Sequence, residues 1–285
     1  MGDFPDIQTK LGDYADWIVS FLARTFDSLF DFIYFVASRT INGIDDFLTW
    51  LPWFVFILII FLLGWYFQSV LAGVLYAGFI FLIGTFGLWN DMMMTISIII
   101  AAVVISLVIG IPMGVWMAFS KLFSNIMRPI LDAMQTMPSF VYLIPAIFFF
   151  GLGNVSAIFA TLIYALPPVI RLTELAIRGV DAEVIESAQS FGSSRWQMLT
   201  KVQLPQALPT IMAGVNQTTM MALAMVVVAS MVGAQGLGEQ VLVSINRIDI
   251  ALGFEAGISI VFLAIIIDRI TNGVADKFQK HRRIS

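Results

Sequence analysis

The sequence has 285 residues, of which 59% are hydrophobic and 12% are charged, with a formal net charge of −4. Soluble globular chains are nearer half apolar and about one quarter charged, so the composition predicts an all-α protein that crosses a membrane several times. The sequence contains no Cys and a single His, His281. This excludes thiol nucleophiles, disulfides, Cys-ligated metals and the two-His motif of zinc proteases.

Residues 1–50 predict an N-terminal amphipathic helical segment rather than a membrane span. Apolar residues such as Trp17, Phe21 and Leu29 recur at helical spacing, with aspartates between them. That pattern favours one or two helices along the membrane surface. A helix that packs against other protein fits the pattern equally well. The acidic face argues against attraction to anionic lipid.

Seven apolar runs follow at close to the length of a membrane span, about 20 residues. The first two, within residues 51–90, are two leading transmembrane helices, and the others belong to a core at 91–272. The fourth run is short and lies beside Pro138 and Pro145, so it is kinked or its helix begins earlier. Residues 273–285 form a basic cytoplasmic tail. The expected spans are 51–67, 70–89, 93–119, 139–152, 155–177, 207–232 and 251–270.

A long polar stretch, residues 181–205, interrupts the apolar chain between the fifth and sixth spans. Asp181 is placed to cap a first short helix, and Gly192 to end it in the left-handed conformation. Ser194 and Gln197 have the spacing of a capping box for a second short helix. Pro205 closes the segment or opens the next helix. This loop must lie in water.

Basic residues predict the orientation of the chain. If the 181–205 loop is cytoplasmic, seven spans place the N-terminus outside and the C-terminus inside. Eleven of the 15 basic residues then lie inside, and Lys10, Arg24, Arg39 and Arg247 lie outside. The positive-inside rule agrees with this placement.

Polar side chains inside a span are costly, and four are consecutive in the sixth: Asn216, Gln217, Thr218 and Thr219. They line a translocation path or make hydrogen bonds between helices, and both interpretations stay open. Arg171 and Glu174, three residues apart, could pair with each other.

Two further patterns concern glycines and tryptophans. Gly233, Gly236 and Gly238 mark a turn that breaks the sixth helix. Tryptophans near span ends, including Trp50, Trp53 and Trp89, favour an interfacial aromatic belt over a quaternary-ammonium cage, because they are scattered along the chain. The sequence has no Walker motif, so any nucleotide must bind elsewhere.

The polar loop resembles the coupling loop of importer-type ABC permeases. In that family an E-A-A triplet is followed by three residues, a glycine, nine residues and I-x-L-P. Here Glu186, Ser187 and Ala188 stand for the triplet, Gly192 is the glycine, and the closing residues are Val202, Leu204 and Pro205. Ser187 and Val202 depart mildly from the pattern. The resemblance implies a helix that docks on an ATPase subunit.

From about residue 91 to 270 the chain is similar to permease subunits of osmoregulatory glycine betaine/proline betaine ABC importers. The resemblance rests on residues 135–153, 164–180, 186–205 and 225–241. It implies a type I ABC importer transmembrane fold in the bacterial cytoplasmic membrane and a non-catalytic permease. Its partners would be a second permease copy, two ATPase subunits that hold ATP and Mg²⁺, and an extracytoplasmic substrate-binding protein, with no nucleic acid.

Other functions stay open on the residues alone. Within the importer class, the solute could be choline, carnitine or an amino acid. An ion-coupled secondary transporter would need carboxylates at the midplane of the spans, and Glu255 and Asp268 lie toward span ends. Neither an intramembrane enzyme nor an osmotic channel is supported, because no paired Asp, Ser/His or metal-ligand set stands out and the coupling pattern argues against a channel.

Overall fold

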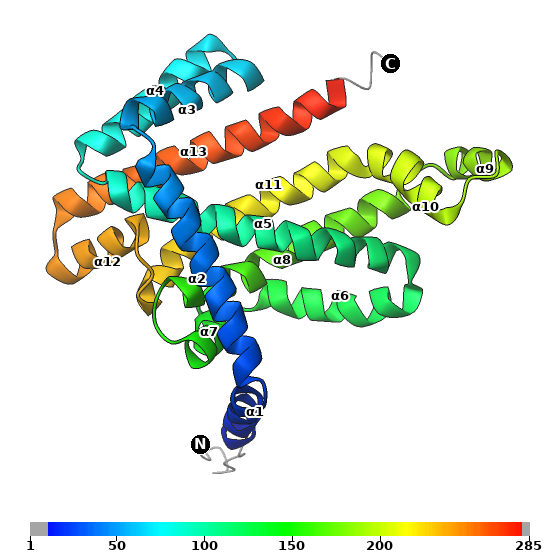
Figure 1. Cartoon of the computed structure of the whole chain (residues 1–285), viewed down its shortest axis with the longest axis horizontal. Coiled ribbons are helices and arrows are strands. Elements are labelled where there is room, and N and C mark those ends of the chain that lie inside the picture. The colour runs from blue at the N-terminus through cyan, green and yellow to red at the C-terminus, as the bar shows by residue number, and fades with distance from the viewer. Residues whose placement is uncertain (1–10, 281–285) are drawn as a thin grey trace, which may run out of the picture.

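The computed structural model describes residues 11–280, which are helical throughout apart from short turns (Figure 1). The N-terminal part contains α1 (Leu11–Thr25), α2 (Asp27–Trp50), α3 (Trp53–Phe67) and α4 (Val70–Thr85). The remainder contains α5 (Trp89–Phe119), α6 (Lys121–Thr136), η1 (Ser139–Tyr142), α7 (Leu143–Phe150), α8 (Asn154–Arg178), α9 (Ala182–Ser190), α10 (Arg195–Gln197), η2 (Met198–Gln203), α11 (Leu204–Ala229), η3 (Ser230–Val232), α12 (Leu237–Arg247) and α13 (Ile250–Lys280).

The centre of the molecule is α8, which packs between α5 and α11. Glycines allow this close approach. A Cβ added to Gly114 of α5 would lie 2.5 Å from the Thr173 Cβ, and one added to Gly110 would lie 2.4 Å from Val169. Gly214 of α11 faces the same stretch of α8 from the other side. Small residues at helix contacts are a principal device for packing helices in a membrane, where apolar surface alone supplies little driving force.

A second glycine contact joins α3 to α4 in a hairpin. The Cα of Gly73 lies 2.8 Å from where a Cβ on Gly64 would be. The two helices have 15 and 16 residues. At 1.5 Å per residue they are about 22–24 Å long, short of the roughly 30 Å of a hydrocarbon core. Gln68 at the tip donates a 2.8 Å hydrogen bond to the Arg269 carbonyl of α13, and Lys277 lies 3.0 Å above the Tyr66 ring.

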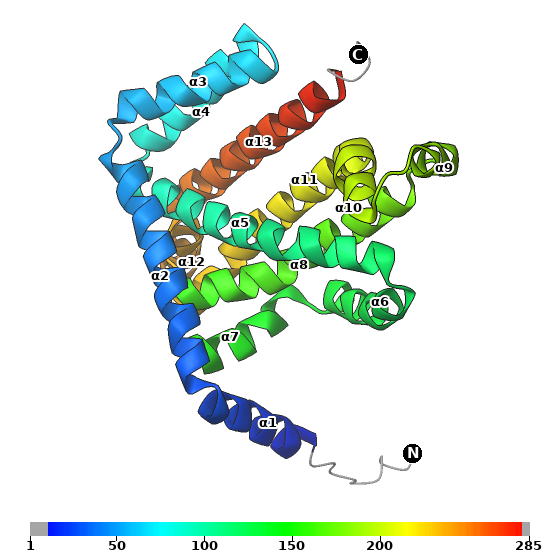
Figure 2. The ribbon, with the colours of Figure 1, turned by 45° about the vertical axis from the view of Figure 1, so that its right-hand side comes forward.

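The N-terminal amphipathic segment forms two helices, α1 and α2. The α2 helix crosses the end of the bundle at which α5 and α8 begin (Figure 2). Its Ala37 and Ile41 pack against Ile98 and Ile158. The chain then bends by 99° into α3. Residues 1–10 lie outside the described range.

The predicted spans map onto the structure with two differences. Among residues 11–280, four helices are long and apolar enough to cross a membrane, and up to six crossings result if each bent pair is one span. The remaining predicted span, 70–89, corresponds to α4, whose 16 residues are too few to be counted by this measure. The fourth predicted span is the eight-residue α7 preceded by η1, and it joins α6 at a 112° bend. Of the two predicted outcomes, the structure therefore supports a kink, which lies at Pro138 between α6 and η1.

The turn after α11 is held by hydrogen bonds to distant helices. Gly233 and Gly236 have positive φ angles of 80° and 113°, whereas Gly238 lies inside α12 and packs on Val227. The Leu237 amide donates to the Thr95 hydroxyl at 2.9 Å. The Gln235 amide donates to the Asn154 side-chain oxygen at 2.8 Å. The turn after α11 is therefore held to α5 and α8 by specific hydrogen bonds.

Candidate functional site

The 181–205 loop projects from one end of the bundle, the same end at which α13 finishes (Figure 1). The α8 helix leads into it and α11 leads out, and these two helices pack along each other. The loop thus grows directly out of the core.

The local chemistry of the loop matches the sequence prediction closely. The Asp181 side chain accepts a 3.0 Å hydrogen bond from the Glu183 amide and caps α9. Gly192 has a φ of 77°, the left-handed conformation that a side chain disfavours. Ser194 and Gln197 form both bonds of a capping box, at 3.3 and 2.9 Å.

The second short helix is not separate. The α10 helix has three residues and passes through the six-residue π-helical segment η2 into α11. Pro205 lies in the first turn of α11, so it opens that helix rather than closing the loop. A π-helical turn carries i→i+5 hydrogen bonds and is often found at functional positions.

The predicted docking residues divide by exposure. Glu186, Ser187 and Gly192 are exposed, whereas Ala188, Val202, Leu204 and Pro205 are partly buried. The loop also presents two large apolar side chains, Phe191 at 89% and Trp196 at 72% exposure. Sequence reasoning missed both of these, although two aromatics inside a polar stretch were a readable signal. Exposed aromatics of this kind are typical of protein contact sites.

The base of the loop is held on one flank by apolar packing. Leu199 and Ala207 pack with Ile177 of α8 and Val115 of α5. The stem of the loop is therefore packed against the core, and α9 projects beyond it (Figure 1).

The other flank of the stem carries a buried ionic cluster. Glu174, whose side chain is 5% exposed, accepts hydrogen bonds from the Ser124 hydroxyl at 2.6 Å and from Arg128 at 3.0 Å, and it pairs with Arg178 at 3.1 Å. Arg171 pairs instead with Asp132. The predicted pairing of Arg171 with Glu174 is therefore wrong, because α6 supplies a partner to each.

The four polar residues of α11 point in different directions. The Asn216 amide donates to Asp268 of α13 at 3.1 Å, and the Thr219 hydroxyl donates to its own helix at Val215. Thr218 is fully buried, and Gln217 is exposed. Asn216 therefore makes an interhelical hydrogen bond, and Gln217 is the residue of the four that faces outward from this chain.

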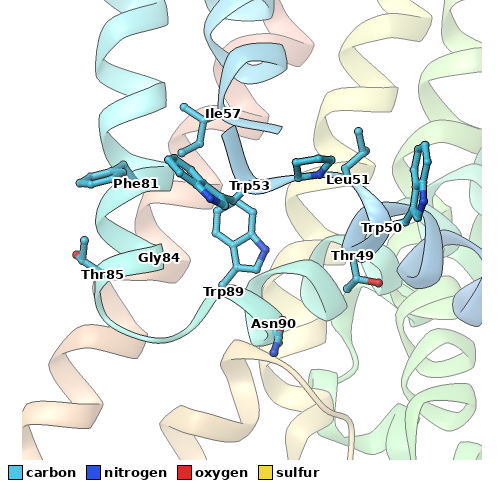
Figure 3. A pocket seen from close by; sticks show the side chains of 11 residues that line it. Thr49, Trp50, Leu51, Trp53, Ile57, Phe81, Gly84, Thr85, Trp89 and Asn90 are labelled. Carbon is cyan, nitrogen blue, oxygen red and sulfur yellow. The ribbon is translucent and has the colours of Figure 1, made fainter. Parts of the chain in front are cut away.

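Tryptophans that are far apart in sequence line one cavity of about 550 Å³ (Figure 3). Trp50 and Trp53 flank the bend between α2 and α3, and Trp89 begins α5. Phe81 and the polar side chains of Thr49, Thr85 and Asn90 complete the lining. Trp50 and Trp53 are largely exposed, which suits an interfacial belt. Over the part of the chain that the structure describes, no cluster of three or more acidic or His residues is suited to hold a metal ion.

Comparison with known families gives a match to the family described as binding-protein-dependent transport system inner membrane component, over residues 106–284. The chain is 46% identical over 259 residues to the glycine betaine/proline betaine transport system permease protein ProW of Escherichia coli, covering 91% of this chain and 72% of that protein. It is 44% identical over 285 residues to the glycine betaine/carnitine transport permease protein GbuB of Listeria monocytogenes, covering 96% and 98%. With the glycine betaine transport system permease protein OpuAB of Bacillus subtilis it shares 43% over 268 residues, covering 94% and 95%.

Among solved structures, the fold resembles a chain of the MetNI methionine ABC transporter in an inward-facing conformation. The TM-score is 0.60 at 22% identity, over 65% of this chain and 92% of that one. This likeness bears on the fold alone, and it agrees with the expected type I importer architecture.

Proposed function

Because the chain belongs to the binding-protein-dependent transport system inner membrane component family, we propose that it is the transmembrane subunit of an ATP-driven ABC importer of glycine betaine or a related quaternary-ammonium solute. The family match favours a non-catalytic transport subunit in a membrane over an ion-coupled transporter or an intramembrane enzyme. The names of the three relatives above support a betaine-type solute. Carnitine, which one of those names includes, is the alternative within the same chemistry.

The observation that carries the proposal is the form of the 181–205 loop. It is a rigid, capped projection whose exposed tip contains Glu186, Phe191 and Trp196 and whose stem continues into α8 and α11. Docking of α9 on an ATPase subunit would transmit movement of that partner straight to the core helices. ATP and Mg²⁺ belong to the partner in this scheme.

The proposed assembly is two copies of this chain, two ATPase subunits and an extracytoplasmic substrate-binding protein. The end with α9 would face the cytoplasm together with the C-terminal end of α13, and α2 would lie on the outer surface. Basic residues support this orientation, since Arg128, Arg178, Arg195 and Lys201 all gather around the loop end.

The translocation path would follow the outward side of α11. Gln206, Ala213, Gln217 and Ala224 are exposed on this helix, and its buried residues pack against α8. An amide in the middle of a span is costly against lipid. A second copy that faces Gln217 across a water-filled path would remove that cost. Asn216 would support the path by holding α11 against α13 through its hydrogen bond to Asp268.

Replacing Gly192 tests the loop. Gly192→Arg puts a side chain at a φ of 77° and on the exposed tip. We expect the reconstituted complex to hydrolyse ATP while solute uptake falls at least about tenfold, a loss of the size reported for broken coupling networks. Uptake and hydrolysis are measured together in proteoliposomes.

Gly192→Asn is the matched control, because Asn tolerates the left-handed conformation. It should retain most of the uptake. Normal uptake by the Arg variant would remove the loop from the mechanism, and uptake by the chain without any ATPase would overturn the importer function.

A further inference from the structure

We propose that Glu174 is a positioning residue that makes α6 and the end of α5 move as one body with the coupling loop. This inference rests on the proposed function, since it concerns how movement of α9 spreads into the membrane part. Glu174 lies in the penultimate turn of α8, seven residues before the Asp181 cap of α9.

The cluster around the Glu174 carboxylate connects α8 to α6 directly and to α5 through Arg178. Ser124 and Arg128 of α6 donate to Glu174 Oε1 at 2.6 and 3.0 Å. Arg178, one turn further along α8, contacts the same oxygen at 3.1 Å. Arg178 also donates to the Met117 carbonyl at 2.7 Å, close to the C-terminal end of α5. The stem of the loop is therefore bonded to the ends of both α5 and α6.

The burial of Glu174 makes its bonds to α6 costly to break. A carboxylate withdrawn from water is stable only while it is paired and hydrogen-bonded. Because the Glu174 side chain is 5% exposed, movement of α8 away from α6 would take the charge from Ser124 and Arg128 and leave it with Arg178 of its own helix alone. Displacement of the stem is thus resisted unless α6 follows it.

The apolar flank of the stem does not reach α6. The cluster around Leu199, Ala207 and Ile211 joins η2 and α11 to α5 and α8. The α6 helix meets α8 in a second apolar cluster, in which Leu131 packs with Val169 and Ile170 and which shares Ile111 of α5 with the first. The carboxylate is therefore the buried polar tie between α6 and the part of α8 that leads into the loop, and its loss should leave the α8–α11 stem intact.

The same two helices provide a matched control. Asp132 of α6 and Arg171 of α8 also form an ion pair, but the Asp132 side chain is 64% exposed. Exposed ion pairs contribute little. If burial gives the Glu174 cluster its role, removing the Asp132 charge should change nothing that is measured below.

The test measures the distance between α6 and α9 in the assembled transporter. The chain contains no Cys, so spin labels can be attached to cysteines introduced at Asn125 and Gln189, both exposed. Distances are recorded by pulsed electron resonance in the nucleotide-free and ATP-trapped complexes. The parent chain should give one distance in both states. Glu174→Gln should give a distance that differs between the two states, and Asp132→Asn should match the parent.

Transport provides the second readout. Solute moved per ATP hydrolysed should fall about 2- to 30-fold in Glu174→Gln, the range for changes within a coupling network. Arg128→Gln, at a half-exposed position that is less critical for folding, should show the same effect more weakly. Arg128→Lys keeps the charge and should recover most of it.

Three outcomes decide the matter. An unchanged distance and an unchanged transport ratio in both Glu174→Gln and Arg128→Gln would overturn the role of the cluster. An equal effect of Asp132→Asn would overturn the role of burial. If Gly192→Arg uncouples transport while the Glu174 variants do not, the proposed function stands and this inference alone fails.

Discussion

The core of α5, α8 and α11 and the hairpin of α3 and α4 both pack through glycines. The core buries much of its apolar surface, whereas the hairpin leaves large apolar side chains exposed. In both, glycines bring helix backbones into contact. In the core, glycines of α5 and α11 pack against α8, and 61% of the apolar 18-residue stretch of α8 is buried. The hairpin closes on itself through Gly64 and Gly73 and leaves large apolar side chains such as Trp65, Leu71 and Leu75 exposed.

The two regions also differ in how they connect to the 181–205 loop. The loop is continuous with α8 and α11, whereas the hairpin contacts the core mainly through α13. The match to MetNI covers 65% of this chain, and the family match begins at residue 106. The relatives GbuB and OpuAB match 96% and 94% of this chain, so the hairpin lies largely within those matches as well.

The largest effect is expected from Gly114→Leu. The new side chain would meet Thr173 and the Ile170 carbonyl within 2.6 Å, so α5 must separate from α8. Overpacking of this kind costs roughly 1–3 kcal/mol. The thermal midpoint of the detergent-purified chain and uptake should both fall. Gly78→Leu on α4, where no atom lies within 4 Å of the added Cβ, should leave both unchanged.

An intermediate effect is expected from Gly73→Leu. Its Cβ would lie 2.6 Å from the Phe61 carbonyl, so the hairpin opens. Protease sensitivity should rise in α3 and α4, while the core keeps its protection and the complex keeps measurable uptake. Loss of core protection in this variant would show that the hairpin and the core form a single cooperative unit.

The smallest effect is expected from Gln68→Leu. It removes the hydrogen bonds to the Arg269 carbonyl and from the Tyr76 hydroxyl, at 2.8 and 2.7 Å. Bonds of this kind in membrane proteins average about 0.6 kcal/mol each. Amide exchange at the tip of the hairpin should accelerate severalfold. Tyr76→Phe, which loses one of the two bonds, should show about half of that change in free energy.

Features set by neighbouring residues were predictable from the sequence. The Asp181 cap, the left-handed Gly192 and the Ser194–Gln197 box each depend on chemistry within four residues, and the structure confirms all three. The spans of α5, α8 and α13 were located because long apolar runs leave few alternatives. Polar lengths such as residues 121–136 gave no such signal, and α6 was not predicted.

Features set by distant residues were not predictable. Glu174 was assigned to Arg171 because helical spacing places them together. Spacing also allows its partner Arg178, four residues on, but Ser124 and Arg128 lie 50 and 46 residues earlier in the chain. The tryptophans around the 550 Å³ cavity were judged scattered for the same reason, since Trp53 and Trp89 meet only after the hairpin folds back. The spacing of residues along one helix does not show which side chains a neighbouring helix places beside them.

The π-helical segment η2 connects the loop to the core without an interruption of the helix. Its six residues connect the capping box directly to α11, with no flexible linker between them. On the other side, three residues separate α8 from α9. If the tip docks on an ATPase subunit as proposed, its displacement would therefore reach α11 directly through η2 and α8 through residues 179–181.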